Sequence, residues 1–285
     1  MPQISENLLV WNQNYTWSRE GDEWSGPWGG VEPNWFGTIY PRIHSFIPAT
    51  TILEIAPGFG RWTQFLKDYC EHLVVVDLSQ RCIEHCKDRF STSSNITYHI
   101  NDGKSLEMVE DESIDFAFSY DSLVHVEADV IEAYLAQLSK KLKPNGVGFI
   151  HHSNFGEYPY LLHLINRIPH KMRLSATDKS TDHPALSLIR KAFPFEDHWR
   201  AYSVTASLFE RVCRQVGLQC FSQELINWRG LLLTDSFSLF TRRDSVWARS
   251  NKVIRNRGFM REAKYISHLS RLYAASQLRD GGRKD

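Results

Sequence analysis

Short apolar runs alternate with longer amphipathic stretches from residue 51 onward. Runs rich in β-branched and aromatic residues, typical of buried strands, lie at 51–56, 73–77, 96–100, 114–120 and 147–152. Apolar residues recur at helical spacing in the intervening segments near 61–70, 79–90 and 127–142. This alternation predicts an α/β fold with a doubly wound, mostly parallel sheet flanked by helices.

The region after the fifth predicted strand divides into an insertion and a second regular part. Residues 153–203 contain four prolines and no clean strand pattern, so we expect an insertion over the carboxyl edge of the sheet. A predicted helix at about 204–216 and two strands, QCFSQELINW and SFSLFTR, would complete a seven-stranded sheet. We therefore predict a core domain at 49–243 between an N-terminal segment, 1–48, and a helical tail, 244–285.

Five of the nine tryptophans lie in a Gly/Pro-rich stretch at 11–36, which has no regular pattern. They are Trp11, Trp17, Trp24, Trp28 and Trp35. Large rings in such a segment either pack as a lid over the core or line a ligand pocket. Both interpretations stay open, and Trp24, Trp28 and Trp35 are our candidate substrate contacts.

The composition, 42% apolar and 23% charged, is that of an ordinary globular protein. No apolar run reaches the roughly 18 residues of a membrane-spanning helix, and no signal peptide pattern opens the chain. We therefore expect a cytoplasmic protein with no membrane partner. The five cysteines form no CxxC pair, which argues against a disulfide framework or a zinc ribbon.

Charge is distributed unevenly, because residues 242–285 carry 12 Lys/Arg and 4 Asp/Glu while the whole chain is neutral. Such a tail either binds an anion or docks on an acidic body or a second subunit. Its apolar residues at helical spacing predict burial of Ile266, Leu269, Leu272 and Tyr273. The spacing does not distinguish the chain's own core from a partner, so a homodimer stays open.

A glycine-containing loop, EIAPGFG at 54–60, lies where the first predicted strand turns into a helix. Glycine there lets the backbone approach a nucleotide-like ligand closely. Asp77 follows Gly60 by 17 residues, at the end of the next strand. It either accepts hydrogen bonds from a ribose or caps the helix beginning near Ser79. A P-loop is excluded because no Gly-Lys-Ser/Thr follows, and Thr63 replaces the third glycine of a dinucleotide fingerprint.

These residues resemble the class I, Rossmann-like S-adenosylmethionine-dependent methyltransferases, in which an acidic-x-Gly-x-Gly-x-Gly loop follows the first strand. Ala56 stands in place of the first glycine. The resemblance extends in element order from about 50 to 241 and implies S-adenosyl-L-methionine as the cofactor.

Carried over position by position, the resemblance implies three groups of cofactor-binding residues. The loop would hold the methionine part on the backbone of Ala56, Gly58 and Gly60, with Glu54 orienting either the loop or the methionine amino group. Asp77 would hold the ribose, and the turn after the third strand would hold the adenine with Asp102 and Gly103. After the fourth strand, Tyr120 and Asp121 would lie beside the methionine or the transferred methyl group.

A methyltransferase must align its acceptor, exclude water and, for a hydroxyl acceptor, remove a proton. Histidine suits that proton transfer near neutral pH, and our candidate catalytic residues are His125 and His152. Successive strand residues point to opposite faces, so at most one of His151 and His152 should face the pocket. A structural role for His125 stays open. No metal is expected, because these ligands follow no recognised spacing.

The leading hypothesis is methylation of a hydroxyl on a small molecule. SYDSLVHVE and GFIHHSN resemble methyltransferases that modify sugars or other hydroxylated metabolites, which implies a sugar or glycan-related acceptor and a role in small-molecule biosynthesis. The alternatives are N-methylation of a small molecule or of RNA, and a cofactor-binding protein without catalysis. Nothing in the core resembles an RNA-reading module, so a nucleic acid partner is not favoured.

Overall fold

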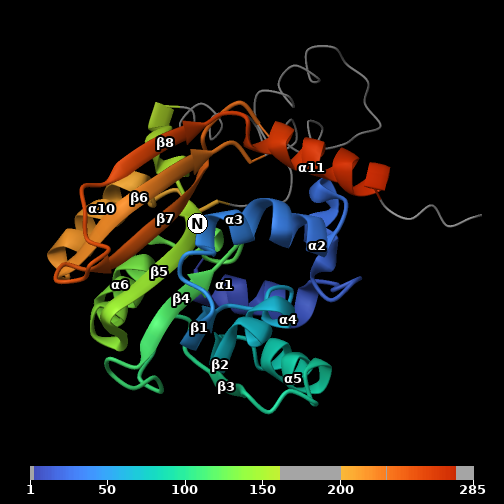
Figure 1. Ribbon diagram of the computed structural model, residues 1–285, viewed down its shortest axis with the longest axis horizontal. Coiled ribbons are helices and arrows are strands. Elements are labelled where there is room, and N and C mark those ends of the chain that lie inside the picture. The colour runs from blue at the N-terminus through green and yellow to red at the C-terminus, as the bar shows by residue number, and fades with distance from the viewer. Residues whose placement is uncertain (1–2, 161–199, 229, 274–285) are drawn as a thin grey trace, which may run out of the picture.

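A central eight-stranded sheet organises the protein. The computed structural model describes residues 3–160, 200–228 and 230–273. The strands lie side by side in the order β3-β2-β1-β4-β5-β7-β6-β8 (Figure 1). Their bounds are β1 (Ala49–Ile55), β2 (Cys70–Asp77), β3 (Ile96–Ile100), β4 (Ile114–Ser119), β5 (Leu142–Ser153), β6 (Leu218–Ile226), β7 (Asp235–Arg242) and β8 (Lys252–Asn256). Only β7 runs antiparallel to its neighbours.

The predicted α/β architecture with a mostly parallel sheet is confirmed, and all seven predicted strands are present. The prediction of seven strands was one short, because β8 adds an edge to β6. The described part of the chain includes helices α1 (Ile4–Leu9), α2 (Val31–Asn34), α3 (Tyr40–Ile43), α4 (Thr63–Leu66), α5 (Gln80–Arg89), α6 (Ala128–Lys141), α10 (Ala206–Gln215) and α11 (Phe259–Tyr273). Shorter 3-10 and π turns are η1 (Val10–Asn14), η2 (Asp22–Trp28), η3 (Trp35–Ile39), η4 (Lys67–Tyr69), η5 (Leu123–His125) and η6 (Phe155–Glu157).

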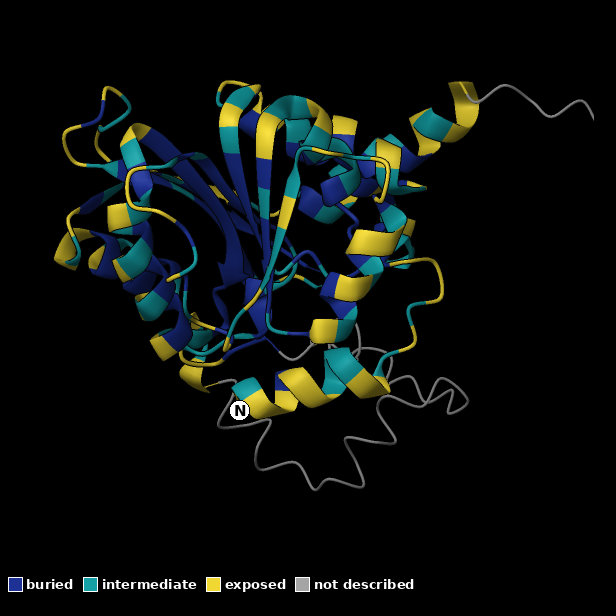
Figure 2. Ribbon diagram, turned by 90° about the horizontal axis from the view of Figure 1, so that it is seen from below, coloured by how far each residue is buried: buried dark blue, intermediate teal, exposed yellow. Residues whose placement is uncertain are grey.

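Helices cover both faces of the sheet, and each face has its own apolar core. One core joins the sheet to α6 and α10, while the other joins it to η3, α3, α4 and α11. Neighbouring residues on β1 illustrate the division, since Leu53 belongs to the first core and Ile52 to the second. Figure 2 shows buried strands between helices whose outer surfaces are exposed.

The tail differs from its predicted helical form. Residues 252–256 form β8, where the β-branched pair Val253 and Ile254 extends along β6, and a helix begins only at Phe259. Ile266 packs against the core as predicted. Leu272 and Tyr273 are instead 71% and 80% exposed in the described part of the chain, so they are not buried in its own core, and their burial against a partner stays a prediction.

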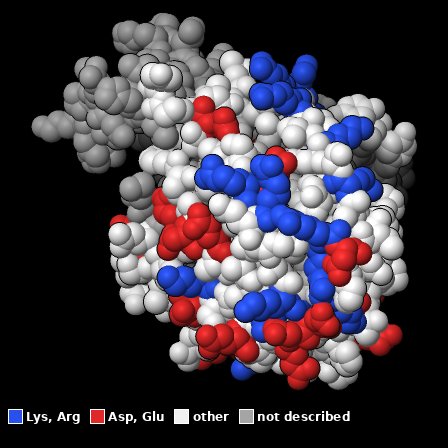
Figure 3. Space-filling model, turned by 90° about the vertical axis from the view of Figure 1, so that its left-hand side faces the viewer, with Lys and Arg blue, Asp and Glu red and all other residues white. Residues whose placement is uncertain are grey.

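Acidic and basic side chains are interspersed on the side of the molecule shown in Figure 3, where a band of Lys and Arg side chains passes between acidic clusters. Among the described residues, no helix is both long and apolar enough to cross a membrane. The predicted insertion at 153–203 lies largely outside the described residues, because 161–199 are not described.

Candidate active site

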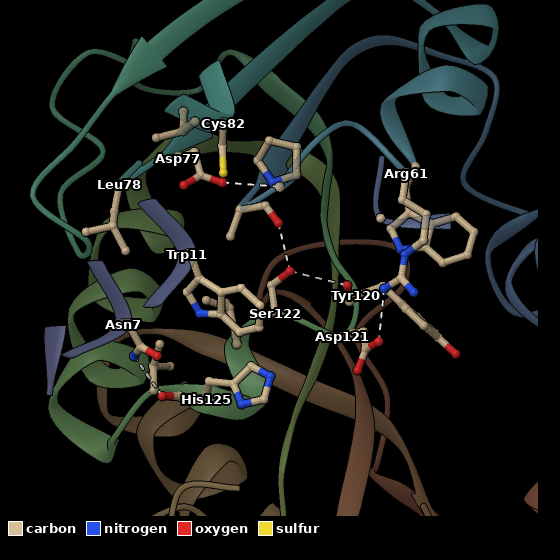
Figure 4. A pocket seen from close by; sticks show the side chains of 18 of the residues that line it. Asn7, Trp11, Arg61, Asp77, Leu78, Cys82, Tyr120, Asp121, Ser122 and His125 are labelled. Atoms are coloured by element: carbon tan, nitrogen blue, oxygen red, sulfur yellow. Dashed lines mark hydrogen bonds and ion pairs between the residues drawn. The ribbon is translucent and has the colours of Figure 1, made fainter. Parts of the chain in front are cut away.

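One cavity opens at the carboxyl ends of the parallel strands, where a fold of this class binds its ligands. The loop after β1, the end of β2 and the segment after β4 form its walls, and the N-terminal segment covers it. In Figure 4, Asp77 lies on one side of the cavity and the Arg61–Asp121 pair on the other, with Trp11 and His125 between and below them.

The loop after β1 is held in a conformation that suits glycine. Gly58 and Gly60 have φ of 60° and 87°, and Ala56 also has a positive φ of 58°. A Cβ at Gly60 would lie 2.5 Å from the Phe90 ring, so the position has room only for glycine. Ala56 and Gly58 line the cavity, whereas Gly60, the third predicted residue of this platform, is not among its lining residues.

Asp77 lines the cavity at the end of β2 while almost fully buried. Its two oxygens accept hydrogen bonds from the backbone N–H of Gly58 at 3.2 Å and of Ser79 at 2.8 Å. Burial raises the pKa of Asp77 to about 6, although those backbone bonds oppose the rise. The helix cap proposed as the alternative role is made by the Ser79 hydroxyl, which accepts from the N–H of Cys82.

Glu54 lies behind the loop and is fully buried. One carboxylate oxygen accepts from the Thr63 hydroxyl at 2.6 Å, and the other has no hydrogen-bond partner among the described residues. Burial raises the pKa of Glu54 to about 8. This geometry places Glu54 where it can orient the loop.

The turn after β3 brings only one of its two predicted residues to the cavity. Gly103 lines it with a φ of 90°. Asp102 is exposed, and its Oδ1 accepts from the backbone N–H groups of Lys104 and Ser105. The carboxylate is thus folded over its own turn, as an Asx turn requires, and not directed at the cavity.

A buried network of charged groups begins at Asp121 and Arg61 on the cavity wall. The Asp121 carboxylate pairs with Arg61 at 2.9 Å and with Arg200 at 3.8 Å. Arg200 also pairs with Asp235 at 2.8 Å. Burial opposes ionisation of Asp121, but the charges of Arg61 and Arg200 hold its pKa below the usual value. The carboxylate is therefore ionised at neutral pH.

His151 connects the backbone of Asp121 to the carboxylate of Asp235. Its Nδ1 accepts from the N–H of Asp121, which has a positive φ of 62°, at 3.1 Å. Its Nε2 lies 3.0 Å from the Asp235 carboxylate and therefore carries the proton. Burial would raise the pKa of Asp235, yet Arg200 and His151 hold it well below its usual range. His151 thus holds the backbone of Asp121 in place beside Asp235.

The two candidate catalytic histidines have different surroundings. His125 lines the cavity, and its ring centroid is 5.5 Å from that of Trp11. His152 is fully buried in the core beside α10, where it stacks on Phe209 and bonds to Ser238. Burial lowers the pKa of His152 to about 4. The choice of His152 as a base is corrected, since strand alternation turns it away from the cavity.

The candidate tryptophans lie in two different places, the cavity wall and the core. Trp24 lines the cavity, together with Trp11 and Trp17, which the sequence did not single out. Trp28 and Trp35 have no exposed surface. Trp28 donates to Thr38 and packs on the Trp228 ring, and Trp35 stacks on Phe65. Those two rings are core residues, so their choice as substrate contacts is corrected.

The N-terminal segment is attached to α5 by two arginine side chains about two helical turns apart. Arg81 donates to the backbone oxygens of Asn12 and Tyr15, and Arg89 pairs with Glu20 at 3.2 Å. Trp17 stacks on Phe59 of the glycine loop, with ring centroids 4.4 Å apart. These contacts hold Trp11 and Trp17 over the cavity.

Two of the cavity's features fit a nucleoside that carries an amino acid. Asp77 is a buried carboxylate with oxygen lone pairs available to ribose hydroxyls, and the positive-φ loop offers backbone groups to an amino-acid chain. Within residues 3–160, 200–228 and 230–273, no three His, Cys, Asp or Glu side chains are grouped to hold a metal ion.

Comparisons with known proteins agree with this geometry. Residues 52–146 match a family model described as a methyltransferase domain. Phosphoethanolamine N-methyltransferase 1 of Triticum aestivum is 30% identical over 120 residues, 40% of this chain and 24% of that protein. The chain thus spans about a quarter of the length of the curated relative it matches.

Solved structures show the same fold. A SAM-dependent methyltransferase from Leishmania major superposes with a TM-score of 0.53 at 11% identity, over 84% of this chain and 82% of that one. The DhpI–SAH complex gives a TM-score of 0.52 at 15% identity, over 85% and 97% of the two chains. Residues 52–146 thus match a methyltransferase domain, and the chain shares its fold with S-adenosylmethionine-dependent methyltransferases.

Proposed function

We propose that this protein transfers a methyl group from S-adenosylmethionine to a hydroxyl of a small molecule. The observation that supports this proposal is that one cavity joins the glycine loop and Asp77 to the ring of His125. A base therefore lies in the same enclosed space as the groups suited to the cofactor.

The residues that would hold the cofactor follow from the cavity lining. Ala56 and Gly58 would hold the methionine part through their backbone, Asp77 the ribose, and Gly103 would leave room for the adenine. When bound, the cofactor supplies a methyl group already activated as a sulfonium. The chain must then position the acceptor and take up its proton.

His125 would accept that proton at a ring nitrogen. Asn7 donates to the backbone oxygen of His125 at 2.9 Å, and the Trp11 ring packs beside the imidazole, so the residue is fixed on the cavity wall. Trp11, Trp17 and Trp24 would exclude water from the reacting atoms. The N-terminal segment thus acts as the cover of the acceptor space.

The test is turnover of the His125→Gln variant on a panel of hydroxylated small molecules, sugars included. We expect kcat to fall by about 10²–10⁴-fold while the affinity for S-adenosylhomocysteine is retained. His44→Gln changes an exposed histidine outside the cavity and serves as the matched control. Unchanged turnover in His125→Gln would assign the histidine a structural role. Cofactor binding without turnover of the wild type on any acceptor would favour a protein without catalysis.

Methylation of an amine is the second candidate. The matched relative is named an N-methyltransferase, and four tryptophans line the cavity. Their ring faces suit the positive charge that a neutral amine gains as it takes up the methyl group. Matched pairs of acceptors that differ only in carrying a hydroxyl or an amino group separate the two candidates. The amine proposal expects turnover of the amino member and little effect of His125→Gln, because a neutral amine needs no base to attack.

A further inference from the structure

Two buried guanidinium groups beside the cavity lack hydrogen-bond partners that their burial calls for. Nη1 of Arg61 and Nη1 of Arg200 have essentially no contact with solvent and no partner within the described residues. Both side chains are more than nine-tenths buried. Buried charged donors are ordinarily satisfied, so two such groups in one place need an explanation.

The two arginines are held together by a single carboxylate. Nη2 of Arg61 and Nη2 of Arg200 bind different oxygens of Asp121, at 2.9 and 3.8 Å. Arg200 is further fixed by Asp235, and Arg61 lies over the Trp62 ring at 4.7 Å. Their positions are therefore set before any ligand binds, and Nη1 of each guanidinium is left without a partner among the described residues.

Arg61 and Asp121 themselves line the cavity. Figure 4 shows this pair across the cavity from Asp77. Arg200 is anchored by Asp235 on β7, beyond β4 and β5 from the β1–β2 edge that presents Asp77 and Gly58. The arginines thus lie on the half of the sheet away from Asp77, whose carboxylate would bind the ribose. That half is the part of the cavity that a methyl acceptor could occupy.

We propose that Arg61 and Arg200 bind an anionic group, a phosphate or carboxylate, of the methyl acceptor. A planar guanidinium with free N–H groups is the side chain best matched to such an oxyanion, and fixed geometry lowers the cost of binding. This inference rests on the proposed function, since it names the class of acceptor for that same cavity.

The experiment titrates inorganic phosphate and, separately, acetate into the full chain saturated with S-adenosylhomocysteine, whose own carboxylate then occupies the cofactor site. We expect one of these anions to bind the wild type, and its affinity to fall by about tenfold or more in Arg61→Gln and in Arg200→Gln. Arg255→Gln, an exposed arginine on β8, is the matched control and should bind the anion as the wild type does.

Lysine variants keep the test decisive if the glutamine variants do not fold. Arg61→Lys and Arg200→Lys preserve the charge beside Asp121 but lose the planar fork of guanidinium donors, so we expect a weaker but measurable affinity for the anion. A single thermal unfolding transition in each variant checks the fold.

Three results would overturn the proposal. The first is that neither anion binds the wild type, and the second is that the variants bind it unchanged. The third is a loss of about tenfold or more in S-adenosylhomocysteine affinity with no separate anion site, which would assign the arginines to the cofactor's carboxylate. If S-adenosylhomocysteine fails to bind the wild type, the proposed function is contradicted. Titration of the anion into the protein without S-adenosylhomocysteine then still measures anion binding by the arginines.

Discussion

The two sides of the cavity are built in different ways. The side that carries Gly58 and Asp77 comes from one continuous stretch, β1 to β2, and is held mainly by backbone hydrogen bonds. The opposite side joins Arg61, Asp121 and, behind them, the pair Arg200 and Asp235 from the far end of the chain, held by buried charges. Local backbone geometry thus forms the first side, and tertiary folding forms the second.

The charged side should be the more sensitive to a single substitution. Asp235→Asn leaves Arg200 without its main counter-ion in a fully buried position, so we expect a loss of about 3–5 kcal/mol in the free energy of unfolding. Urea unfolding followed by circular dichroism measures it. Asp111→Asn removes an exposed carboxylate paired with Lys141 and should leave stability nearly unchanged. Equal effects of the two substitutions would mean that the buried network does not stabilise this side.

The backbone side should respond to a methyl group in the glycine loop. Gly60→Ala adds a Cβ at a φ of 87°, 2.5 Å from the Phe90 ring, so we expect a cost of about 1–3 kcal/mol and weaker binding of S-adenosylhomocysteine. Gly26→Ala, where an added Cβ meets nothing within 4 Å, is the control. Unchanged binding in Gly60→Ala would show that the loop tolerates a different shape.

The backbone side should also make the free energy of unfolding depend on pH. Glu54 has a folded-state pKa of about 8, above its ordinary 4.5, so the folded protein holds this proton more tightly. Glu54 therefore contributes its whole stabilising free energy below pH 4.5, and this contribution is lost as the pH rises through 8. Glu54→Gln should flatten this decline by up to about 1 kcal/mol per pH unit, measured by unfolding at a series of pH values. An unchanged slope would mean that Glu54 is not protonated in the folded state.

The sequence predicted the backbone side well because its signals are local. The spacing from Gly58 to Asp77 and the strand pattern around it determine which groups reach the carboxyl edge of the sheet. Asp102 was misplaced because a short polar side chain in a turn bonds to its own backbone, which the spacing cannot reveal.

The charged side could not be predicted in the same way. Arg200 and Asp235 are far from Asp121 in sequence, and only the pairing of β5 with β7 brings them to His151. Strand alternation allowed only one histidine of the 151–152 pair to face the cavity side, but it did not indicate which one. The tryptophans divided between cavity and core because their segment has no periodicity to indicate a face.

The central claim is that this cavity binds S-adenosylmethionine through Asp77, and calorimetric titration tests it most directly. S-adenosylmethionine and S-adenosylhomocysteine are titrated into the wild type and into Asp77→Ala. The account predicts binding to the wild type that weakens by about 10- to 100-fold in the variant, because a charged hydrogen-bond acceptor for the ribose is lost. Absence of binding to the wild type, or equal affinity in Asp77→Ala, would contradict it.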